Sequence, residues 1–600
     1  MDSGTQNKEE GIGMKRKAMK KGETSQPIYK VKYLGEVMIP MRDGVRLAAD
    51  IFVPDARGKF PALLAYAVWS KETSSHLQWT LPPQPHYQTL VWDGTIEGGS
   101  SNYLVSRGYA HVMAQPRGIG HSEGVVDKNF ATDGYDVIEW IAQQPWCDGN
   151  VGTIGISAFG YSQLVVATTQ PPHLRCIMPL NAMCDVYRDG PYAAGILHTF
   201  FFYLKAVYLA VHTVDPEHRA EQQRLAREAL SNPDNPDIYP VRDIMMHSEI
   251  YNALVHPQVS DTSWGLFDYM MHPYDGPFYW ERSPSYRLDD IKVPAYLGDE
   301  WRTYNYGFMT GAFRSFAGLK VPKRLMMLPG RIERPMMAVD PDLSKRPFAG
   351  YADETIRWCD YWLKGIDTGI MDEPPLKIFT MQECEPYAGT WHFENEWPPA
   401  RTKWTKFYLH TYGRLSTEPP GATYTIPDSF VQAPITITNK IESCKYQTGP
   451  LPEDLTITGP IALKLYASID TEDDNWIVGL SDVAPDGRKM ELTRGFLKCS
   501  HRAIDPSKSK PWQPYHPHTK ESVENIQPGS IYEYDIEIRP TSNKFLAGHR
   551  IELEIMSMSG PTQRIAFGAS SFHMCSNHVC CHKIYRDPEH PSHVLLPVIP

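Results

Sequence analysis

The stretch from Val151 to Gln163, which reads V-G-T-I-G-I-S-A-F-G-Y-S-Q, constrains the fold more than any other part of the chain. An apolar, β-rich run enters a glycine, Ser157 stands at the tip, and small residues lead into a second apolar run. This pattern is typical of a nucleophile elbow, a sharp strand-to-helix turn that holds a serine hydroxyl out of the sheet. The amide of Ala158 can then donate to an oxyanion. Because the spacing is G-x-S-x-x-G rather than G-x-S-x-G, a purely structural turn stays open as the alternative.

The overall composition excludes several classes of protein. A chain of 600 residues is too long for one core, and its length predicts two to four domains. A net charge of −11 gives no reason to expect a nucleic-acid partner, and no apolar run is long enough to cross a membrane. The ten cysteines are spread mostly singly, which is typical of reduced thiols. We therefore expect a soluble, cytoplasmic protein with neither nucleic-acid nor membrane partners.

The first 194 residues divide into a tail and an α/β region. Residues 1–30 are polar and basic, with no apolar segment of a secretory signal, and predict a disordered tail. From 31 to 194, buried strands at 60–66, 109–114 and 151–156 alternate with helical segments such as 133–143. Such alternation predicts a mostly parallel sheet covered on both faces, with the elbow at the carboxyl end of a strand.

Two changes of pattern follow. Between 195 and 285 the strand signal disappears, which predicts a helical cap over a pocket. Its methionines either line that pocket or fill the core of the cap, and they are Met245, Met246, Met270 and Met271. The α/β pattern resumes over 286–374. From 375 to 600, short alternating runs between Pro- and Gly-rich turns predict an all-β sandwich.

Taken together, these segments resemble the cocaine-esterase and X-prolyl dipeptidyl-peptidase-like group of α/β-hydrolases, from about Tyr33 to the C-terminus. Besides the elbow, the motifs that carry the resemblance are Pro116-Arg117-Gly118, Ser122-Glu123-Gly124, Asp133-Gly134-Tyr135-Asp136, Gln144-Pro145-Trp146, Tyr279-Trp280-Glu281-Arg282-Ser283-Pro284, Leu363-Lys364-Gly365, Pro485-Asp486-Gly487 and Ala547-Gly548-His549-Arg550. The resemblance implies an α/β-hydrolase domain, a helical cap and a C-terminal jelly-roll (galactose-binding-like) domain.

The resemblance also implies a set of catalytic roles, of which only part carries over. The nucleophile is Ser157. The tyrosine that joins the family's oxyanion hole falls on Trp69, whose indole N–H can still donate. The acid of the family's triad falls on Thr303, within the segment Gly298-Asp299-Glu300-Trp301-Arg302-Thr303.

The family's catalytic histidine has no counterpart at its expected place. It corresponds to the segment Leu328-Pro329-Gly330-Arg331-Ile332-Glu333, and the chain has no histidine anywhere from Pro273 to Trp391. A serine hydroxyl is a weak nucleophile without an adjacent base. The sequence therefore predicts that ordinary ester hydrolysis is slow or absent.

Three functions stay open, and the first is favoured. It is a non-hydrolytic step such as cyclisation, isomerisation, elimination or carbon–carbon bond chemistry on a bulky hydrophobic metabolite. Donors at Ser157, Trp69 and the Ala158 amide would stabilise a developing oxyanion. Acid, base or charge would come from Asp299, Glu300, Arg331 or Glu333.

The second function is a serine esterase, amidase or X-Pro dipeptidyl-peptidase-like enzyme whose base is displaced to His121 or His198. The third is a ligand-binding pseudoenzyme. The third would bind either a ligand or a protein partner. The expected partner is a small hydrophobic substrate, a homodimer is an option, and no cofactor is expected. The predicted substrate-binding residues are Tyr66, His198, Met245, Met270, Met271 and Trp301.

A group near the C-terminus combines cysteine and histidine: Cys575, His578, Cys580, Cys581 and His582. Its adjacent cysteines fit poorly with tetrahedral zinc, in which two residues usually separate paired ligands. Strand alternation would instead place several of these side chains inside as ordinary core residues. We therefore expect no metal site.

Overall fold

The central strands of the first part of the chain are buried along their whole length. In β3 (Phe60–Tyr66) and β4 (Ala110–Ala114) every residue is buried, as expected for a sheet covered on both faces. The computed structural model describes residues 20–67, 71, 98–125, 129–197, 217, 224, 269, 272–301, 308–329, 349–382, 384–422, 426–434, 437–438, 440–558 and 578–600.

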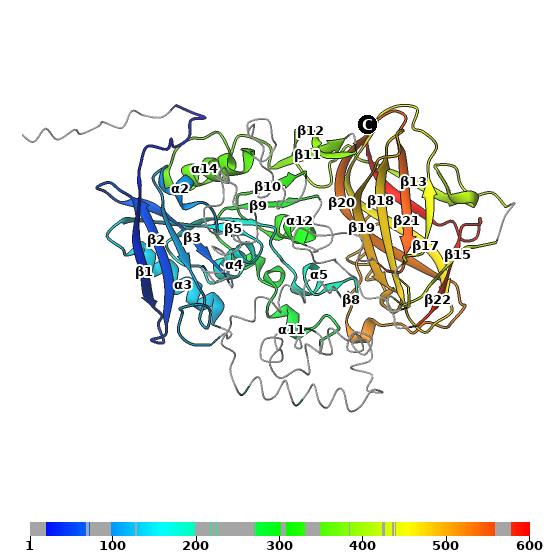
Figure 1. The fold of residues 1–600 in the computed structure, drawn as a ribbon, viewed down its shortest axis with the longest axis horizontal. Coiled ribbons are helices and arrows are strands. Elements are labelled where there is room, and N and C mark those ends of the chain that lie inside the picture. Colours follow the sequence, from blue (N-terminus) through cyan, green and yellow to red (C-terminus); the bar gives the residue numbers. More distant parts are fainter. Residues whose placement is uncertain are drawn as a thin grey trace, which may run out of the picture.

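These strands belong to a mixed, mostly parallel sheet that we call the sheet domain (Figure 1). The order across it is β1-β2-β4-β3-β5-β6-β9-β10-β11-β12; pairing is parallel from β4 to β11 and antiparallel at both ends. The remaining bounds are β1 (Val31–Pro40), β2 (Arg46–Pro54), β5 (Cys147–Ile156), β6 (Leu174–Leu180), β9 (Ala295–Glu300), β10 (Lys323–Leu328), β11 (Leu376–Gln382) and β12 (Glu385–Glu394).

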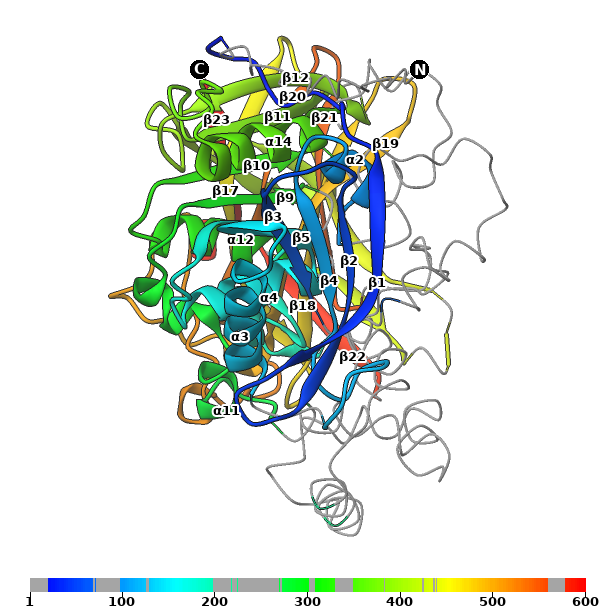
Figure 2. The same cartoon turned by 90° about the vertical axis from the view of Figure 1, so that its left-hand side faces the viewer.

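Helices cover both faces of the sheet. One face packs against α3 (Phe130–Ala142), α4 (Ala158–Ala167) and α12 (Phe308–Gly318), and the other against α2 (Ser101–Val105) and α14 (Ala349–Lys364). Figure 2 shows α3 and α4 side by side in front of the strands. Thus the strands at 60–66, 109–114 and 151–156 and the helix at 133–143 are confirmed within a few residues.

The second part of the chain, residues 403–599, forms what we call the all-β domain, at the opposite end of the molecule from β1 (Figure 1). Its strands are β13 (Lys403–His410), β14 (Arg414–Ser416), β15 (Asp428–Gln432), β16 (Ser443–Gln447), β17 (Leu455–Ile469), β18 (Asn475–Val483), β19 (Lys489–Lys498), β20 (Tyr532–Phe545), β21 (Arg550–Met556), β22 (Cys580–Tyr585) and β23 (His593–Ile599). The expected run of short strands after 375 is therefore present.

The boundary between the two domains differs from the expected one at residue 374. β11 continues the parallel sheet, since Leu325 of β10 pairs with Leu376. The end of β11 then pairs with β20 of the all-β domain, through Met381 and Asn543. Strand pairing therefore continues from one domain into the other. The change of sequence pattern after residue 374 does not coincide with a break between sheets.

The predicted disordered tail is wrong for its last third. Ser25 donates from both its amide and its hydroxyl to the buried carboxylate of Asp360, at 2.6 and 2.8 Å. Tyr109 and Lys364 bind the same carboxylate. Residues 20–30 therefore supply partners that a buried charge in α14 needs, and they are held in place. Residues 1–19 lie outside the described part of the chain.

The expected cap over 195–285 lies mostly outside the described residues. What is described begins with α5 (Val186–Asp189) and the hairpin β7 (Tyr192–Ala193) and β8 (Ile196–Leu197), and resumes at α11 (Pro277–Trp280). The hairpin packs against apolar side chains of β18 and β19. Within the described residues, no helix is long and apolar enough to cross a membrane.

Candidate active site

Ser157 lies at the tip of the turn between β5 and α4, in a backbone conformation that favours glycine. Its φ is 58° and its ψ is −116°. A positive φ is uncommon in residues other than glycine and costs free energy, so the surrounding structure must hold it. Ser157 is only partly buried, whereas the strand that precedes it is buried. The turn thus presents the hydroxyl at the carboxyl edge of the parallel strands, as predicted.

Contacts with the neighbouring strand β6 hold this turn. The amide of Ser157 donates to the carbonyl of Leu180 at 2.9 Å. The same carbonyl lies only 2.3 Å from where a Cβ on Gly160 would stand, so α4 approaches β6 as closely as it does only because residue 160 has no side chain. The glycine three residues after Ser157, which departs from the common motif, is therefore explained by helix–strand packing.

The amide expected to stabilise an oxyanion is in a suitable position. Ala158 is the first residue of α4, and the first amides of a helix have no acceptor inside the helix. Ala158 and Phe159 pack with Ala65 and Ala67, at the end of β3. Trp69 follows Ala67 by two residues and lies outside the described part.

Asp299 and Glu300 end strand β9 but point to opposite faces of the sheet. Asp299 alternates with Leu297 and Trp301, which pack towards α12, whereas Glu300 alternates with Tyr296, which packs against α14. Both acidic side chains are at most 2% exposed. Opposite directions prevent the two carboxylates from acting together on one atom.

A layer of buried charges lies on the α12 face. Asp189 accepts from Arg314 at 2.6 Å and from Thr310 at 2.8 Å. Arg539, from β20 of the all-β domain, interacts electrostatically with Asp189 and Asp299, and burial lowers the pKa of this guanidinium to about 10. These charges join the two domains, which gives Asp299 a structural role beside any chemical one.

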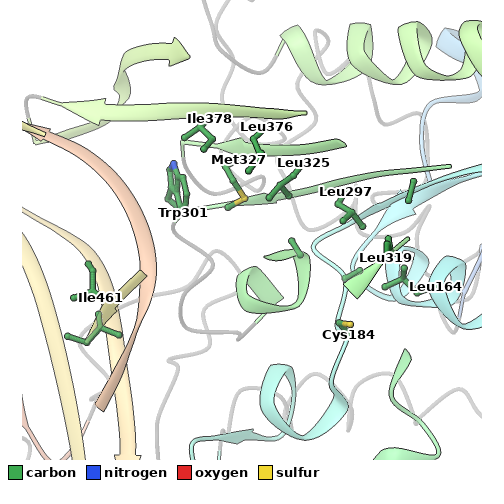
Figure 3. Packing of buried hydrophobic residues seen from close by; sticks show 14 of the residues in the cluster. Leu164, Cys184, Leu297, Trp301, Leu319, Leu325, Met327, Leu376, Ile378 and Ile461 are labelled. Atoms are coloured by element: carbon green, nitrogen blue, oxygen red, sulfur yellow. The ribbon is translucent and has the colours of Figure 1, made fainter. Parts of the chain in front are cut away.

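Two predicted substrate-binding residues are instead part of the core. Trp301 is fully buried, packs beside the stacked rings of Phe313 and Trp397, and donates its indole N–H to the carbonyl of Phe379 at 2.7 Å. Figure 3 shows it packed beside β10 and β11. Its hydrophobic ring is enclosed because β11 extends the sheet, which the sequence boundary at 374 did not anticipate.

Tyr66 lies between β3 and α3. It is 3% exposed, its ring stacks on Phe130 with the centroids 4.9 Å apart, and its hydroxyl donates to the carbonyl of Phe130 at 3.2 Å. Its ring also faces Gly134, where a Cβ would meet it at 3.2 Å. The structure therefore places the Tyr66 ring in the helix layer, and its contact with substrate stays a prediction.

The remaining predicted residues lie outside the described part of the chain, so the structure does not place them. They are Trp69, His198, Met245, Met246, Met270, Met271, Thr303, Arg331 and Glu333.

His121 is too far from the elbow to act as its base. Its Nδ1 lies 2.8 Å from Glu36 on β1. Strands β3, β4 and β2 separate β1 from β5, so four strand spacings of about 4.8 Å, roughly 19 Å in all, lie between them. A general base must lie within hydrogen-bond reach of the proton it takes.

Asn181 lies beside the elbow, and sequence reasoning did not single it out. It follows Leu180 directly, has a φ of 43°, and donates its amide to the carbonyl of Gly298 at 2.8 Å. It therefore lies between the elbow and the end of β9. Among the described residues its buried side-chain oxygen has no hydrogen-bond partner. The sequence feature that could have pointed to Asn181 is its place as a polar residue directly after a buried strand.

Two groups of described side chains could hold a metal ion; one lies within the all-β domain, the other joins Cys384, between β11 and β12, to that domain, and neither is beside Ser157. One combines Cys384, Asp482 and His549, and the other Asp474, Cys580 and His582. The predicted alternation is confirmed for β22, where Cys580 and His582 are buried and Cys581 is half-buried. Cys575 lies outside the described residues, and His578 is exposed.

Comparisons with known proteins agree with this architecture. Residues 43–331 match the family described as X-Pro dipeptidyl-peptidase (S15 family), and residues 368–595 match the X-Pro dipeptidyl-peptidase C-terminal non-catalytic domain. Cocaine esterase of Rhodococcus sp. (strain MB1 Bresler) is 26% identical over 94% of this chain and 98% of its own length.

Solved structures show the same fold. A CocE/NonD family hydrolase from Staphylococcus aureus has a TM-score of 0.72 and 22% identity, covering 95% of this chain and 93% of that one. An α-amino acid ester hydrolase has a TM-score of 0.67 and 18% identity, covering 99% of this chain and 100% of that one. The protein is thus a member of the X-Pro dipeptidyl-peptidase-like family, and it is similar to cocaine esterase and to a CocE/NonD family hydrolase.

Proposed function

We propose that the protein is a serine hydrolase that cleaves an ester or amide of a small hydrophobic molecule, with Ser157 as nucleophile. The observation that carries this proposal is the strained backbone of Ser157, with φ 58° and ψ −116°, at the carboxyl edge of the sheet. A chain that had no use for this hydroxyl would not need a non-glycine residue in a conformation that costs about 1–3 kcal/mol.

The architecture supports the proposal. The strand order and the helix layers are those expected of an α/β-hydrolase domain, and we infer that the all-β domain is a jelly roll that helps to close the substrate site. Ser157 would attack the carbonyl carbon, and the Ala158 amide, with the Trp69 indole N–H, would stabilise the tetrahedral oxyanion. The hydrolase names of the relatives favour this function over the non-hydrolytic one.

The base is the part of the machinery that differs from the family pattern. With His121 held against Glu36, the displaced base that we propose is His198, which directly follows β8. It would accept the proton of the Ser157 hydroxyl and return it to the leaving group. A neutral imidazole needs a pKa below the working pH for this role, so activity should fall under acidic conditions.

The test is the turnover of short p-nitrophenyl esters by the wild type and three variants. We expect Ser157→Ala to remove turnover, His198→Ala to lower kcat at least a hundredfold, and His121→Ala to leave it unchanged. Turnover equal to the buffer rate in the folded wild type would overturn the hydrolase. Equal loss in His121→Ala and His198→Ala would overturn the assignment of the base.

One sequence observation favours a second function, a non-hydrolytic step on a bulky hydrophobic metabolite. The chain has no histidine from Pro273 to Trp391, and Thr303 stands where the family has its acid. In that case Ser157 and the Ala158 amide would stabilise an enolate or alkoxide without forming an acyl-enzyme. A wild type that rearranges an intact metabolite but never forms an acyl-enzyme would support it. If the protein is instead a binder without turnover, its ligand should stabilise the wild type and the Ser157→Ala variant equally.

A further inference from the structure

Asp474, Cys580 and His582 converge inside the all-β domain, far from the elbow in the fold. Cys580 and His582 are two residues apart on β22, so strand alternation points both to the same face, and Asp474 directly precedes β18. All three are at most 3% exposed. One ligand atom from each lies within 4.8 Å of the other two. We call these three residues the β22 cluster.

Hydrogen bonding does not explain why the imidazole of His582 is buried. Its side chain is 0% exposed, and neither of its ring nitrogens has a hydrogen-bond partner among the residues that the structure describes. The ring stacks on Phe430, with centroids 4.5 Å apart, and meets the edge of Trp476. Its ionic neighbour is the carboxylate of Asp474, at a distance longer than an ordinary charge-assisted hydrogen bond. A buried imidazole held mainly between aromatic rings is costly unless something else binds its nitrogen.

The distance from His582 to Asp474 points to what that partner is. Nε2 of His582 lies 3.4 Å from Oδ2 of Asp474, which is long for a charge-assisted hydrogen bond of about 2.7–2.9 Å. With zinc–nitrogen and zinc–oxygen bonds of about 2.0–2.2 Å, two ligand atoms of a tetrahedral zinc ion are about 3.4 Å apart. The separation fits two ligands of one ion better than it fits a donor and its acceptor.

The second cluster provides an internal comparison. There Nδ1 of His549 lies 2.7 Å from Asp482, an ordinary hydrogen bond, and the thiol of Cys384 donates to the carbonyl of Asp482 at 3.3 Å. Those polar groups satisfy one another without an ion. The same three residue types therefore occur twice, once with a His–Asp hydrogen bond of 2.7 Å and once with a His–Asp separation of 3.4 Å. In the β22 cluster the sulfur of Cys580 also lies 3.2 Å from the hydroxyl of Thr471.

We propose that the β22 cluster binds one zinc ion, through a carboxylate oxygen of Asp474, the thiolate of Cys580 and Nε2 of His582. Thiolate, imidazole and carboxylate are the ligands that zinc prefers. On binding, the Cys580 thiol releases its proton to solvent, and the thiolate and carboxylate together balance the two charges of the ion. Because the complex is neutral, the Asp474 carboxylate and the His582 imidazole can lie together in this buried, largely aromatic environment.

The ion would have a structural role. Asp474 and Cys580 are more than a hundred residues apart in the chain, and the backbone amide of Cys499, at the end of β19, donates to the carbonyl of Asp474 at 2.8 Å. An ion held here would fix β22 to the start of β18 and, through the Cys499–Asp474 hydrogen bond, to the end of β19. The inference does not depend on the proposed hydrolase function, because the cluster and Ser157 belong to different domains.

The experiment measures metal in the purified full-length protein. We expect close to one zinc ion per chain by mass spectrometry, lost in Cys580→Ser and in His582→Gln, and kept in the matched variants Cys384→Ser and His549→Gln. A strong chelator should lower the melting temperature of the wild type, and added zinc should restore it.

Cobalt provides a test that does not need the variants to fold. Cobalt(II) added to the chelator-treated wild type should give the visible bands of tetrahedral coordination and a thiolate-to-cobalt charge-transfer band. Wild-type protein with negligible zinc that also gives no charge-transfer band would overturn the proposal. So would zinc that disappears with Cys384→Ser but stays with Cys580→Ser.

Discussion

Replacing Gly160 by alanine should damage the elbow more than a single methyl group normally would. The new Cβ would stand 2.3 Å from the carbonyl oxygen of Leu180, whereas real Cβ atoms essentially never come closer than 3.0 Å. Helix α4 and strand β6 must therefore separate by at least about 0.7 Å, the difference between these two distances. That carbonyl also accepts a hydrogen bond from the amide of Ser157, so the change acts directly on the turn that carries Ser157.

The expected change in the free energy of unfolding combines two destabilising effects and one stabilising effect. Forcing a methyl group into packed structure costs about 1–3 kcal/mol. A weakened Ser157 hydrogen bond adds about 0.5–1.5 kcal/mol. Alanine in place of glycine within a helix returns about 0.5–1 kcal/mol. We expect a net loss of about 1–3 kcal/mol in the free energy of unfolding, and roughly tenfold or slower reaction of Ser157, since rates are sensitive to shifts of this size.

The assay combines denaturant unfolding with the rate at which a fluorophosphonate probe labels the protein. Gly449→Ala is the matched control, because that exposed glycine has no atom within 4 Å of its added Cβ and no positive φ. Identical unfolding and labelling of the Gly160→Ala and Gly449→Ala variants would refute the argument that the close approach of α4 to β6 positions Ser157.

Three further predictions concern buried charges. Ser25→Ala should lower the free energy of unfolding by about 1.5–2 kcal/mol in denaturant titrations, because the buried carboxylate of Asp360 loses a hydroxyl donor; no change would mean that residues 20–30 are not held there. Asp189→Ala should cost about 3 kcal/mol, since Arg314 loses its buried partner, and unaltered unfolding would contradict this. Burial raises the pKa of Asp275 to about 6, so the folded state holds this proton to higher pH than the unfolded state, and stability should fall as pH rises from about 4 to 6. Melting curves of Asp275→Asn should lack that fall, and the same slope in both proteins would count against the shift.

Much of the sheet domain could be predicted from the sequence, because its strands are apolar over their whole length. β3 and the elbow occur where the pattern placed them, and Ser157 has the strained backbone that a nucleophile elbow requires. The strand β11 was missed as part of this sheet, because its residues match the short alternating runs that follow. Register with a distant strand, here Leu325 with Leu376, is not a local property of the chain.

The candidate site was predictable only where one short motif sets the geometry. Trp301 and Tyr66 were expected at the substrate, but the structure packs both rings into the core. Asn181 was missed because only the order of the strands brings β6 between the elbow and β9. The closeness of Asp474 to Cys580 likewise depends on the topology of the all-β domain, whereas the alternation of Cys580 and His582 could be predicted from the sequence alone.

The nucleophilic role of Ser157 is the central claim, and the mass of the protein after reaction with a fluorophosphonate tests it most directly. The account predicts one adduct per chain, located on the peptide that contains Ser157, and no adduct on Ser157→Ala that folds as the wild type does. A folded wild type that stays unlabelled, or that carries the adduct on another residue, would contradict it.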